Sequence, residues 1–294
     1  MKASTECIYC TINKMYELFC KFVDDEEERF IFTKEMLKEM SSYPDNATAP
    51  FLSSRVMRII KKRTDISDLY VKEKELYNNK ILSIEEDIFK NINETDDKLL
   101  SALKYSMVGN FIDFGAMKTI DDKLLEKIID TALKQNVDIS TYEMFRKELL
   151  EADKLCYILD NAGEVIFDKL FIKMIKELNP GIEINIIVRG EPVLNDITYE
   201  DAVKLGIDKL GNIIENGTDI AGTDIDEVNE LTRNAIFSSD LVISKGQGNF
   251  ETLYGTEANI YYIFLCKCDM FVRRFSINKF EGIFTKWSDI TKRT

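Results

Sequence analysis

The first half of the chain carries the hydrophobic pattern of helices. Apolar residues recur three and four positions apart, the period of one helix face, in residues 8–23, 28–40, 51–63 and 98–113. Strand-like runs are scarce before residue 150, and the stretch 41–50, which contains two prolines, predicts a loop between two helices. The pattern therefore predicts an all-helical N-terminal region, which we assign to residues 1–105.

The pattern changes at about residue 153, where short apolar runs begin to alternate with helical segments. Helical patterns cover residues 165–181, 197–207 and 226–239, and five candidate strands accompany them: 154–160, 183–190, 211–217, 240–246 and 259–267. The strands lack alternating polar positions, which is typical of strands buried on both faces of a parallel sheet. Residues 106–294 therefore predict an α/β fold, a three-layer α/β/α Rossmann-like core with a mainly parallel sheet.

The charge of the chain restricts its partners. The 39 basic and 52 acidic residues give a formal net charge of -13, which is unfavourable for binding the phosphate backbone of nucleic acid. The sequence has no histidine, and this excludes Ser-His-Asp triads and histidine-ligated zinc or iron. No signal-peptide pattern and no run of about 18 apolar residues occurs. We expect a cytoplasmic protein that binds neither nucleic acid nor a membrane.

Six cysteines are too few to form a disulfide scaffold in 294 residues, so reduced thiols are expected. Cys7 and Cys10 lie one helical turn apart, and Cys266 and Cys268 are separated by one residue. A four-thiolate zinc site would form if these two ends of the chain met. The sequence favours buried or inactive thiols instead, because cysteine is among the most frequently buried residue types.

Polar residues gather where the predicted strands end. Ligands of an open parallel sheet bind beyond the carboxyl ends of its strands, so these positions are the candidates for a functional site. They are Asp160, Asn161 and Glu164 after the first strand, Arg189 and Asp196 after the second, Lys245, Gly248, Asn249 and Glu251 after the fourth, and Lys267 after the fifth.

The side chains at the strand ends indicate two kinds of ligand. The oxygen atoms of Asp160, Asn161 and Asp196 are of the kind that Mg²⁺ and Mn²⁺ prefer. Lysines and the backbone N–H groups of the glycine turn at 246–248 suit a phosphate group. Taken alone, Asp160, Asn161 and Asp196 are more typical of helix caps, and the glycine turn fits a simple strand-to-helix connection equally well. Their joint occurrence at one sheet edge favours a binding site.

Four sequence motifs, taken together, resemble the damage-control phosphatase family, long called domain of unknown function 89. They are residues 109–113, 160–164 with Asp168 downstream, 189–196 and 245–251, and they follow one another in the order of that family. The start at Cys7 and Cys10 is similar to the prokaryotic branch. The resemblance covers almost the whole chain.

This resemblance implies a helical N-terminal part, a Rossmann-like core and a metal-dependent phosphatase. The substrates implied are phosphomonoesters of small metabolites, such as sugar phosphates or damaged metabolites, and the implied cofactor is Mn²⁺, Co²⁺, Ni²⁺ or Mg²⁺. By the resemblance, Asp160, Asn161 and Asp196 hold the metal and Lys267 contacts phosphate, which makes these four the catalytic set. The expected substrate-binding residues are Asn110, Glu164, Arg189, Lys245, Gly248, Asn249 and Glu251.

Two other functions compete with a phosphatase. One is a nucleotide- or methyl-donor-binding transferase on the same core, although no G-x-G-x-x-G follows the first strand. The other is a metal- or metabolite-binding protein without activity. Within the phosphatase hypothesis, the nucleophile is either a water on the metal or a carboxylate such as Asp160, and a proton for the leaving group would come from such a water, Glu164 or Glu251. The sequence leaves the oligomeric state open.

Overall fold

The computed structural model describes residues 1–109 and 122–290, and its N-terminal part is helical, as predicted. The helices of this part are α1 (Thr5–Cys20), α2 (Glu26–Glu39), α3 (Ala49–Thr64), α4 (Val71–Leu82), α5 (Glu85–Asn93), α6 (Lys98–Val108), α7 (Asp122–Leu133) and α8 (Ile139–Glu151). Four of them, α1, α2, α3 and α6, correspond to the predicted helical patterns. The predicted loop at 41–50 is shorter than expected because α3 already begins at Ala49.

The pattern missed α4 because this helix buries polar rather than apolar side chains. Lys74, Asn78 and Lys80 of α4 are all buried beside the apolar Ile81. A helix whose inward face is polar shows no apolar period, so the search for hydrophobic periodicity cannot find it. Helix α1, in contrast, shows the apolar spacing, and it begins after Ser4, whose hydroxyl accepts from the backbone N–H of Cys7.

The second part of the chain contains one six-stranded sheet in the order β3-β2-β1-β4-β5-β6. The strands are β1 (Lys154–Ile158), β2 (Glu183–Val188), β3 (Asn212–Glu215), β4 (Leu241–Lys245), β5 (Ile260–Leu265) and β6 (Gly282–Lys286). Strands β1 to β5 pair with one another in parallel, as predicted. Strand β6 was not predicted, and it pairs antiparallel with β5 at the edge of the sheet.

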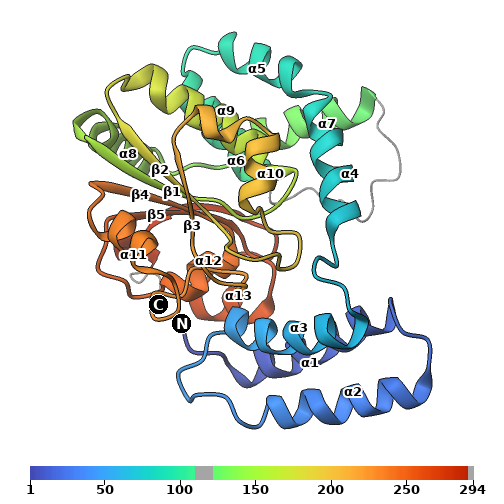
Figure 1. Ribbon diagram of the computed structural model, residues 1–294. Coiled ribbons are helices and arrows are strands. Elements are labelled where there is room, and N and C mark those ends of the chain that lie inside the picture. Colours follow the sequence, from blue (N-terminus) through green and yellow to red (C-terminus); the bar gives the residue numbers. More distant parts are fainter. Residues whose placement is uncertain (110–121, 291–294) are drawn as a thin grey trace.

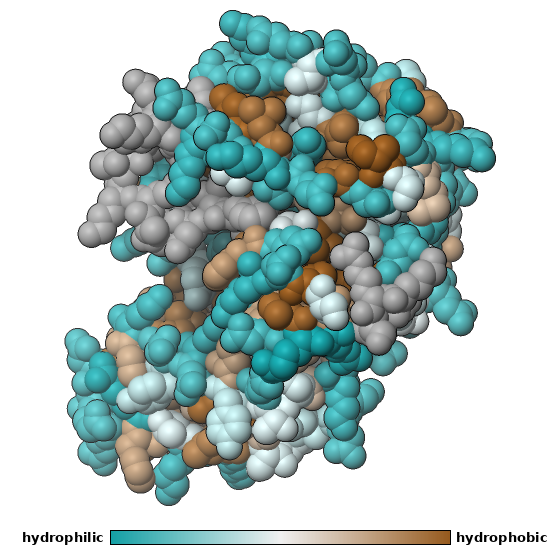
Figure 2. All heavy atoms as spheres, turned by 180° about the vertical axis from the view of Figure 1, so that it is seen from behind, coloured by the Kyte–Doolittle hydropathy of each residue, from teal (hydrophilic) through white to brown (hydrophobic). Residues whose placement is uncertain are grey.

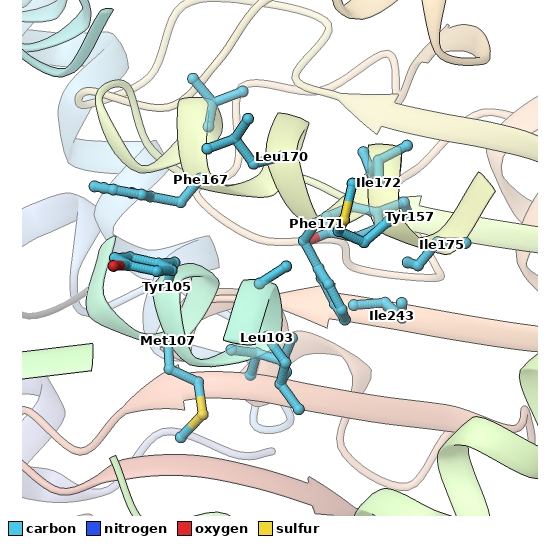
Figure 3. Close-up of a cluster of buried hydrophobic side chains, with 14 of the residues drawn as sticks. Leu103, Tyr105, Met107, Tyr157, Phe167, Leu170, Phe171, Ile172, Ile175 and Ile243 are labelled. Atoms are coloured by element: carbon cyan, nitrogen blue, oxygen red, sulfur yellow. The ribbon is translucent and has the colours of Figure 1, made fainter. Parts of the chain in front are cut away.

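Helices cover both faces of the sheet, which confirms the predicted three-layer α/β/α core (Figure 1). One face carries α6, α8, α9 (Glu164–Leu178) and α10 (Tyr199–Lys204), followed by the 3₁₀ helix η2 (Ile207–Lys209). The other face carries α11 (Glu230–Phe237), α12 (Gln247–Leu253), α13 (Asp269–Phe275) and α14 (Trp287–Ile290). In Figure 3, which shows the first of these two apolar layers, Phe167 of α9 stacks on Tyr105 of α6, and Phe171 of α9 packs against Tyr157 of β1.

Helices α1, α2 and α3 form a lobe of their own below the sheet (Figure 1). They share an apolar cluster in which the rings of Phe19 and Phe32 stack with their centroids 4.0 Å apart. Figure 2 shows this lobe set off from the rest of the molecule by a narrower waist, with a mostly hydrophilic surface on both parts. The boundary predicted at residue 105 falls inside α6, whose buried side chains belong to the apolar cluster of the sheet. Among the described residues, no helix is long and apolar enough to cross a membrane.

Gly190 fixes the path of the chain just after β2. A Cβ atom at this position would lie 2.5 Å from the Cα of Gly217, in the segment that follows β3. The backbone N–H of Gly190 donates to the carbonyl of Thr218 at 3.1 Å, which ties the two segments together. Glycine at position 190 therefore allows the ends of β2 and β3 to approach each other.

We predict that Gly190→Ala lowers the free energy of unfolding by about 1–3 kcal/mol, because the added methyl group overlaps backbone that has no room to move. Urea unfolding followed by circular dichroism measures this change. Gly181→Ala is the matched control, since the nearest atom to its added Cβ is 3.8 Å away. Equal stability of the two variants would contradict the prediction.

Candidate active site

Two chain segments meet at the carboxyl ends of β1 and β2. The backbone N–H of Ile197 donates to the carbonyl of Asp160 at 2.9 Å, and Asn161 and Asp196 form an isolated antiparallel bridge. Parallel strands present their carboxyl ends at one edge of a sheet, and these pairings bring the two loops into contact there. The three residues that the sequence predicted as metal ligands, Asp160, Asn161 and Asp196, therefore lie together.

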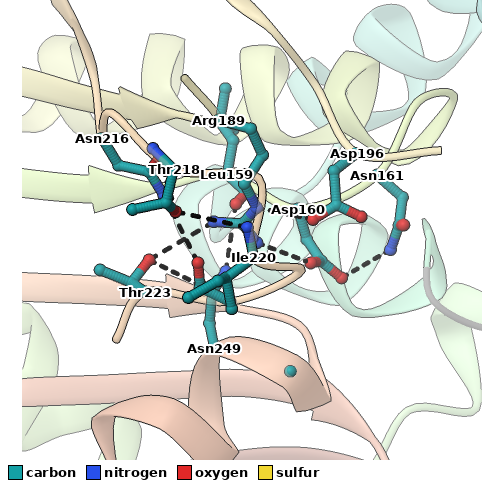
Figure 4. A network of polar contacts seen from close by, with 12 residues as sticks. Leu159, Asp160, Asn161, Arg189, Asp196, Asn216, Thr218, Ile220, Thr223 and Asn249 are labelled. Carbon is teal, nitrogen blue, oxygen red and sulfur yellow. Dashed lines mark hydrogen bonds and ion pairs between the residues drawn. The ribbon is translucent and has the colours of Figure 1, made fainter. Parts of the chain in front are cut away.

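Arg189 joins the two aspartates (Figure 4). Its Nε donates to Oδ2 of Asp196 at 2.6 Å, and its Nη2 donates to Oδ1 of Asp160 at 3.4 Å. The other carboxylate oxygen of Asp160 accepts from Nδ2 of Asn161 at 2.5 Å. Arg189 was predicted to bind substrate. It is only 1% exposed, and its guanidinium group is paired with the two carboxylates.

A chain of polar contacts holds Arg189 in place (Figure 4). Its Nη1 donates to the hydroxyl of Thr223 at 3.4 Å, and this hydroxyl donates to Oδ1 of Asn249 at 2.8 Å. The side-chain nitrogen of Asn249 donates in turn to the carbonyls of Leu159 and Lys245, at 3.1 and 2.7 Å. Asn249 was predicted to line the substrate pocket, and here its side chain connects the ends of β1 and β4.

Burial and like charge dominate the electrostatics of the two aspartates. Burial raises the pKa of Asp160 well above its usual range, and the charges of Asp196 and Glu164 raise it further against the opposing effect of Arg189 and Lys267. Burial likewise raises the pKa of Asp196, although Arg189 opposes the shift. Carboxylates in such a position gain stability from an additional positive charge beside them.

A second buried ion network lies behind the aspartates. The ammonium group of Lys245 donates to Oδ1 of Asp168 at 2.7 Å, to Oε1 of Glu164 at 3.0 Å and to the carbonyl of Ser106 at 2.9 Å. The hydroxyls of Ser106 and Tyr157 also donate to Oδ1 of Asp168, at 2.7 and 2.8 Å. Lys245 was predicted to bind substrate, but its side chain is fully buried and its ammonium group is engaged within this network.

Glu164 connects the two networks. Its Oε1 accepts from Lys245, and its Oε2 accepts from Nδ2 of Asn161 at 3.2 Å. The amide nitrogen of Asn161 is thereby held between Glu164 and Asp160, which leaves its carbonyl oxygen as the atom that can face a cation. Burial lowers the pKa of Lys245, but the charges of Asp168 and Glu164 outweigh it and raise the pKa overall. Lys245 therefore remains a cation at neutral pH.

The glycine motif leads directly from β4 into a helix. Helix α12 begins at Gln247, so that only Gly246 precedes it, and Gly248 lies inside the helix. A Cβ on Gly246 would fall 2.0 Å from Oδ2 of Asp160, and a Cβ on Gly248 would fall 2.2 Å from the carbonyl of Ala221. These glycines are thus needed for close packing around the site. Residues 246–248 thus lead from β4 into α12, which is the strand-to-helix connection that the sequence left open, and a role of this segment in holding phosphate stays a prediction.

Gln247 connects the exposed Lys267 with the buried Glu251. Lys267 is exposed, and its backbone N–H donates to Oε1 of Gln247 at 3.0 Å. Gln247 donates through Nε2 to Oε1 of Glu251 at 2.8 Å. Burial raises the pKa of Glu251 above its usual range. The remaining predicted residue, Asn110, lies outside the described residues.

The sequence reasoning missed the contribution of α4. Oδ1 of Asn78 accepts from the backbone N–H of Gly163 at 2.8 Å, and Gly163 has a left-handed φ of 80°. Four residues before Asn78, the ammonium group of Lys74 pairs with Asp68 at 2.8 Å and Asp201 at 2.7 Å. Helix α4 thus supports the segment 160–163 from the side. In the sequence, a polar helix face that is buried looks the same as a polar helix face that is exposed to solvent.

The donor set of the site fits a hard divalent cation. Two carboxylates and one amide provide oxygen ligands only, the set that Mg²⁺ and Mn²⁺ favour. Across residues 1–109 and 122–290, no group of three or more Cys, Asp or Glu side chains is arranged to hold a metal ion, so Asn161 is needed to complete the set. The conceivable zinc site of Cys7, Cys10, Cys266 and Cys268 is not assembled in this part of the chain, and these cysteines are free thiols.

We predict that Lys245→Met lowers the free energy of unfolding by about 3–5 kcal/mol, because it leaves Glu164 and Asp168 buried without a cation. Urea unfolding at neutral pH measures the loss. Lys154→Met is the control, since Lys154 is an exposed lysine at the start of β1. Adding Glu164→Gln and Asp168→Asn to Lys245→Met should recover much of the loss, and no recovery would show that packing rather than charge is responsible.

The chain resembles proteins of three archaea along nearly its whole length. It is 33% identical to an uncharacterised protein of Methanocaldococcus jannaschii, over 97% of this chain and 96% of that protein. It is 30% identical to a damage-control phosphatase of Pyrococcus horikoshii and 29% identical to a damage-control phosphatase of Archaeoglobus fulgidus, in both cases over 95% of this chain and 96% of the relative.

A solved structure and a family model agree with these relatives. The crystal structure of a DUF89 family protein from Pyrococcus horikoshii matches the fold with a TM-score of 0.88 and 27% identity, over 97% of this chain and 99% of that one. Residues 3–283 match the model of the damage-control phosphatase ARMT1-like domain. The resemblance predicted from the four motifs is confirmed, and the chain belongs to the ARMT1-like damage-control phosphatase family, also called DUF89.

Proposed function

We propose that this protein is a metal-dependent phosphatase that hydrolyses phosphomonoesters of small metabolites, such as sugar phosphates or damaged metabolites. The relatives named damage-control phosphatase support a phosphatase activity. The observation that carries the metal dependence is the charge balance of the buried site. Four buried carboxylates, Asp160, Glu164, Asp168 and Asp196, face two buried cations, Arg189 and Lys245. If all are ionised, two negative charges remain, which one divalent cation would neutralise.

Asp160, Asn161 and Asp196 would hold the cation. Mn²⁺, Co²⁺, Ni²⁺ or Mg²⁺ at this position would supply positive charge to the phosphate oxygens and activate a water. Arg189 fixes one oxygen of each aspartate, and Glu164 fixes the amide of Asn161. The chain thus sets the orientation of all three ligands before substrate arrives, which is how partners behind the ligands tune a metal site.

Lys267 is the proposed phosphate contact. Of the two lysines in the predicted site, Lys267 is the exposed one. Its positive charge acts to lower the pKa of Asp160, against the larger effect of burial. Its ammonium group would add positive charge to the oxygens of a phosphoryl group in the transition state. The flexible, exposed side chain allows this contact without disturbing the buried ions.

Glu251 is the better supported of the two proposed proton donors for the leaving group. Burial raises its pKa, which is the direction that a general acid requires. Both carboxyl oxygens of Glu164 are already engaged, Oε1 by the ammonium group of Lys245 and Oε2 by the amide of Asn161. We therefore assign Glu164 to the positioning of Asn161.

We expect chelator-stripped protein to release no phosphate from p-nitrophenyl phosphate or sugar phosphates, and release to return with Mn²⁺, Co²⁺, Ni²⁺ or Mg²⁺. Asp160→Asn and Asp196→Asn should each lower the rate by more than about 100-fold, since even partners behind a metal ligand contribute 10- to 100-fold. Asp130→Asn, at an exposed aspartate of α7, is the control and should keep full activity.

Calorimetric titration of Mn²⁺ into the same variants separates an enzyme from a binding protein. A non-catalytic metal protein would bind Mn²⁺, would lose this binding in Asp160→Asn, and would turn over no phosphomonoester in either form. Turnover in the presence of excess chelator would contradict metal dependence.

We predict that Lys267→Met lowers kcat/KM for phosphomonoesters by roughly 10- to 1,000-fold while the affinity for Mn²⁺ changes little, because Lys267 stabilises charge on the phosphoryl group. Steady-state kinetics and metal titration measure the two effects separately. Lys279→Met, at an exposed lysine just before β6, provides the comparison. A parallel loss of metal affinity and activity would instead place Lys267 in the support of the aspartates.

A further inference from the structure

A second concave site lies on α9, away from the strand ends. It is a pocket of about 370 Å³ between α9 and the α10–η2 segment. Four of its eight lining residues are lysines, and none of the described residues that line it is acidic. We call it the lysine pocket and define it by Lys169, Lys173, Lys204 and Lys209.

The positive charge of the lysine pocket is only partly balanced. Lys169 and Lys173 share one carboxylate, that of Glu85 on α5, at 3.0 and 3.4 Å. Within the described part of the chain, Lys204 and Lys209 form no ion pair. The whole protein carries a net charge of -13, so this accumulation of lysines does not follow from a generally basic surface. Among the described residues, the four lysines of this pocket thus share a single ion-pair partner, Glu85.

The rest of the lining is apolar. Leu82 at the end of α4, Leu205 after α10 and Leu210 after η2 complete the walls. Gly206 lies between them with a left-handed φ of 73° and open space where a side chain would be. Pockets that bind small molecules commonly span roughly 300–1,000 Å³ and combine apolar walls with a few polar groups, and the lysine pocket has both properties.

We infer that the lysine pocket binds a small organic phosphate that carries two or more negative charges, at a site separate from the candidate active site. The ammonium groups of Lys204 and Lys209 would donate to the phosphate oxygens, and Lys169 and Lys173 would add charge from the opposite wall. The carbon skeleton of the ligand would rest on the three leucines. Inorganic phosphate shares the charge but cannot use the apolar walls.

The position of the lysine pocket connects it to the site at the strand ends. Helix α9 begins at Glu164, in the buried ion network, and carries Lys169 and Lys173 further along. Helix α4 holds Gly163 through Asn78 and reaches the lysine pocket through Leu82. A ligand in this pocket would thus contact the two helices that support the segment 160–164.

Equilibrium dialysis of the full chain tests the inference, with excess chelator present so that binding does not depend on a metal at Asp160. The probes are ADP, fructose 1,6-bisphosphate and inorganic phosphate. We expect one molecule of ADP or of fructose 1,6-bisphosphate to bind per chain. The probe that binds with the higher affinity shows whether the ligand is a nucleotide or a sugar phosphate. Inorganic phosphate should bind more weakly than the tighter ester. Retention of none of the three would overturn the inference.

Two sets of variants locate the binding. Lys204→Ala combined with Lys209→Ala should weaken binding at least about tenfold, because hydrogen bonds to charged groups are lost. Glu85→Gln should strengthen it, since Lys169 and Lys173 then lack their competing carboxylate, and a folding defect cannot produce a gain. Lys38→Ala combined with Lys62→Ala, at exposed lysines of α2 and α3, is the control. Equal binding by the Lys204/Lys209 variant and the unsubstituted chain would place the ligand elsewhere and overturn the inference.

Discussion

The structure depends on the compensation of charge that is buried at the carboxyl edge of the sheet. A buried ion without a partner costs several kcal/mol, so each carboxylate here constrains the element that carries a cation. Arg189 connects the end of β2 to the loops that carry Asp160 and Asp196. Lys245 connects the end of β4 to Asp168 on α9 and to the carbonyl of Ser106 on α6. These ion pairs connect the sheet with α6 and α9 at the edge of the sheet where the proposed active site lies.

The N-terminal lobe reaches the same edge of the sheet. Arg58 of α3 pairs with Asp219 beyond β3, with Nε and Oδ2 2.9 Å apart, and the ammonium group of Lys61 donates to the carbonyl of Pro192. Pro50 of α3 lies close to Gly248 of α12, since a Cβ added to Gly248 would be 3.7 Å from the Pro50 side chain. The buried ions thus come from the α/β core, while α3 borders the edge at which they lie. The N-terminal lobe therefore borders the proposed site without contributing any of its proposed metal ligands.

Much of the fold follows from the period of the apolar residues. Strands such as β1 and β4 bury both faces, so they show as continuous apolar runs between helical patterns. Strand β6, which pairs antiparallel with β5 at one edge of the sheet, was not predicted. Helix α4 was missed because its inward side chains include Lys74 and Asn78, which are polar and buried together with their partners.

The sequence by itself determined the layers of the core, the family motifs and the gathering of Asp160, Asn161 and Asp196, because parallel strands present their carboxyl ends at one edge. Only the tertiary structure decided which charged residues face solvent. Lys245 and Lys267 both follow apolar runs, yet the first is fully buried among carboxylates and the second is exposed. The difference depends on whether a carboxylate from another helix lies within hydrogen-bonding distance, and the packing of α6 and α9 against the sheet settles this.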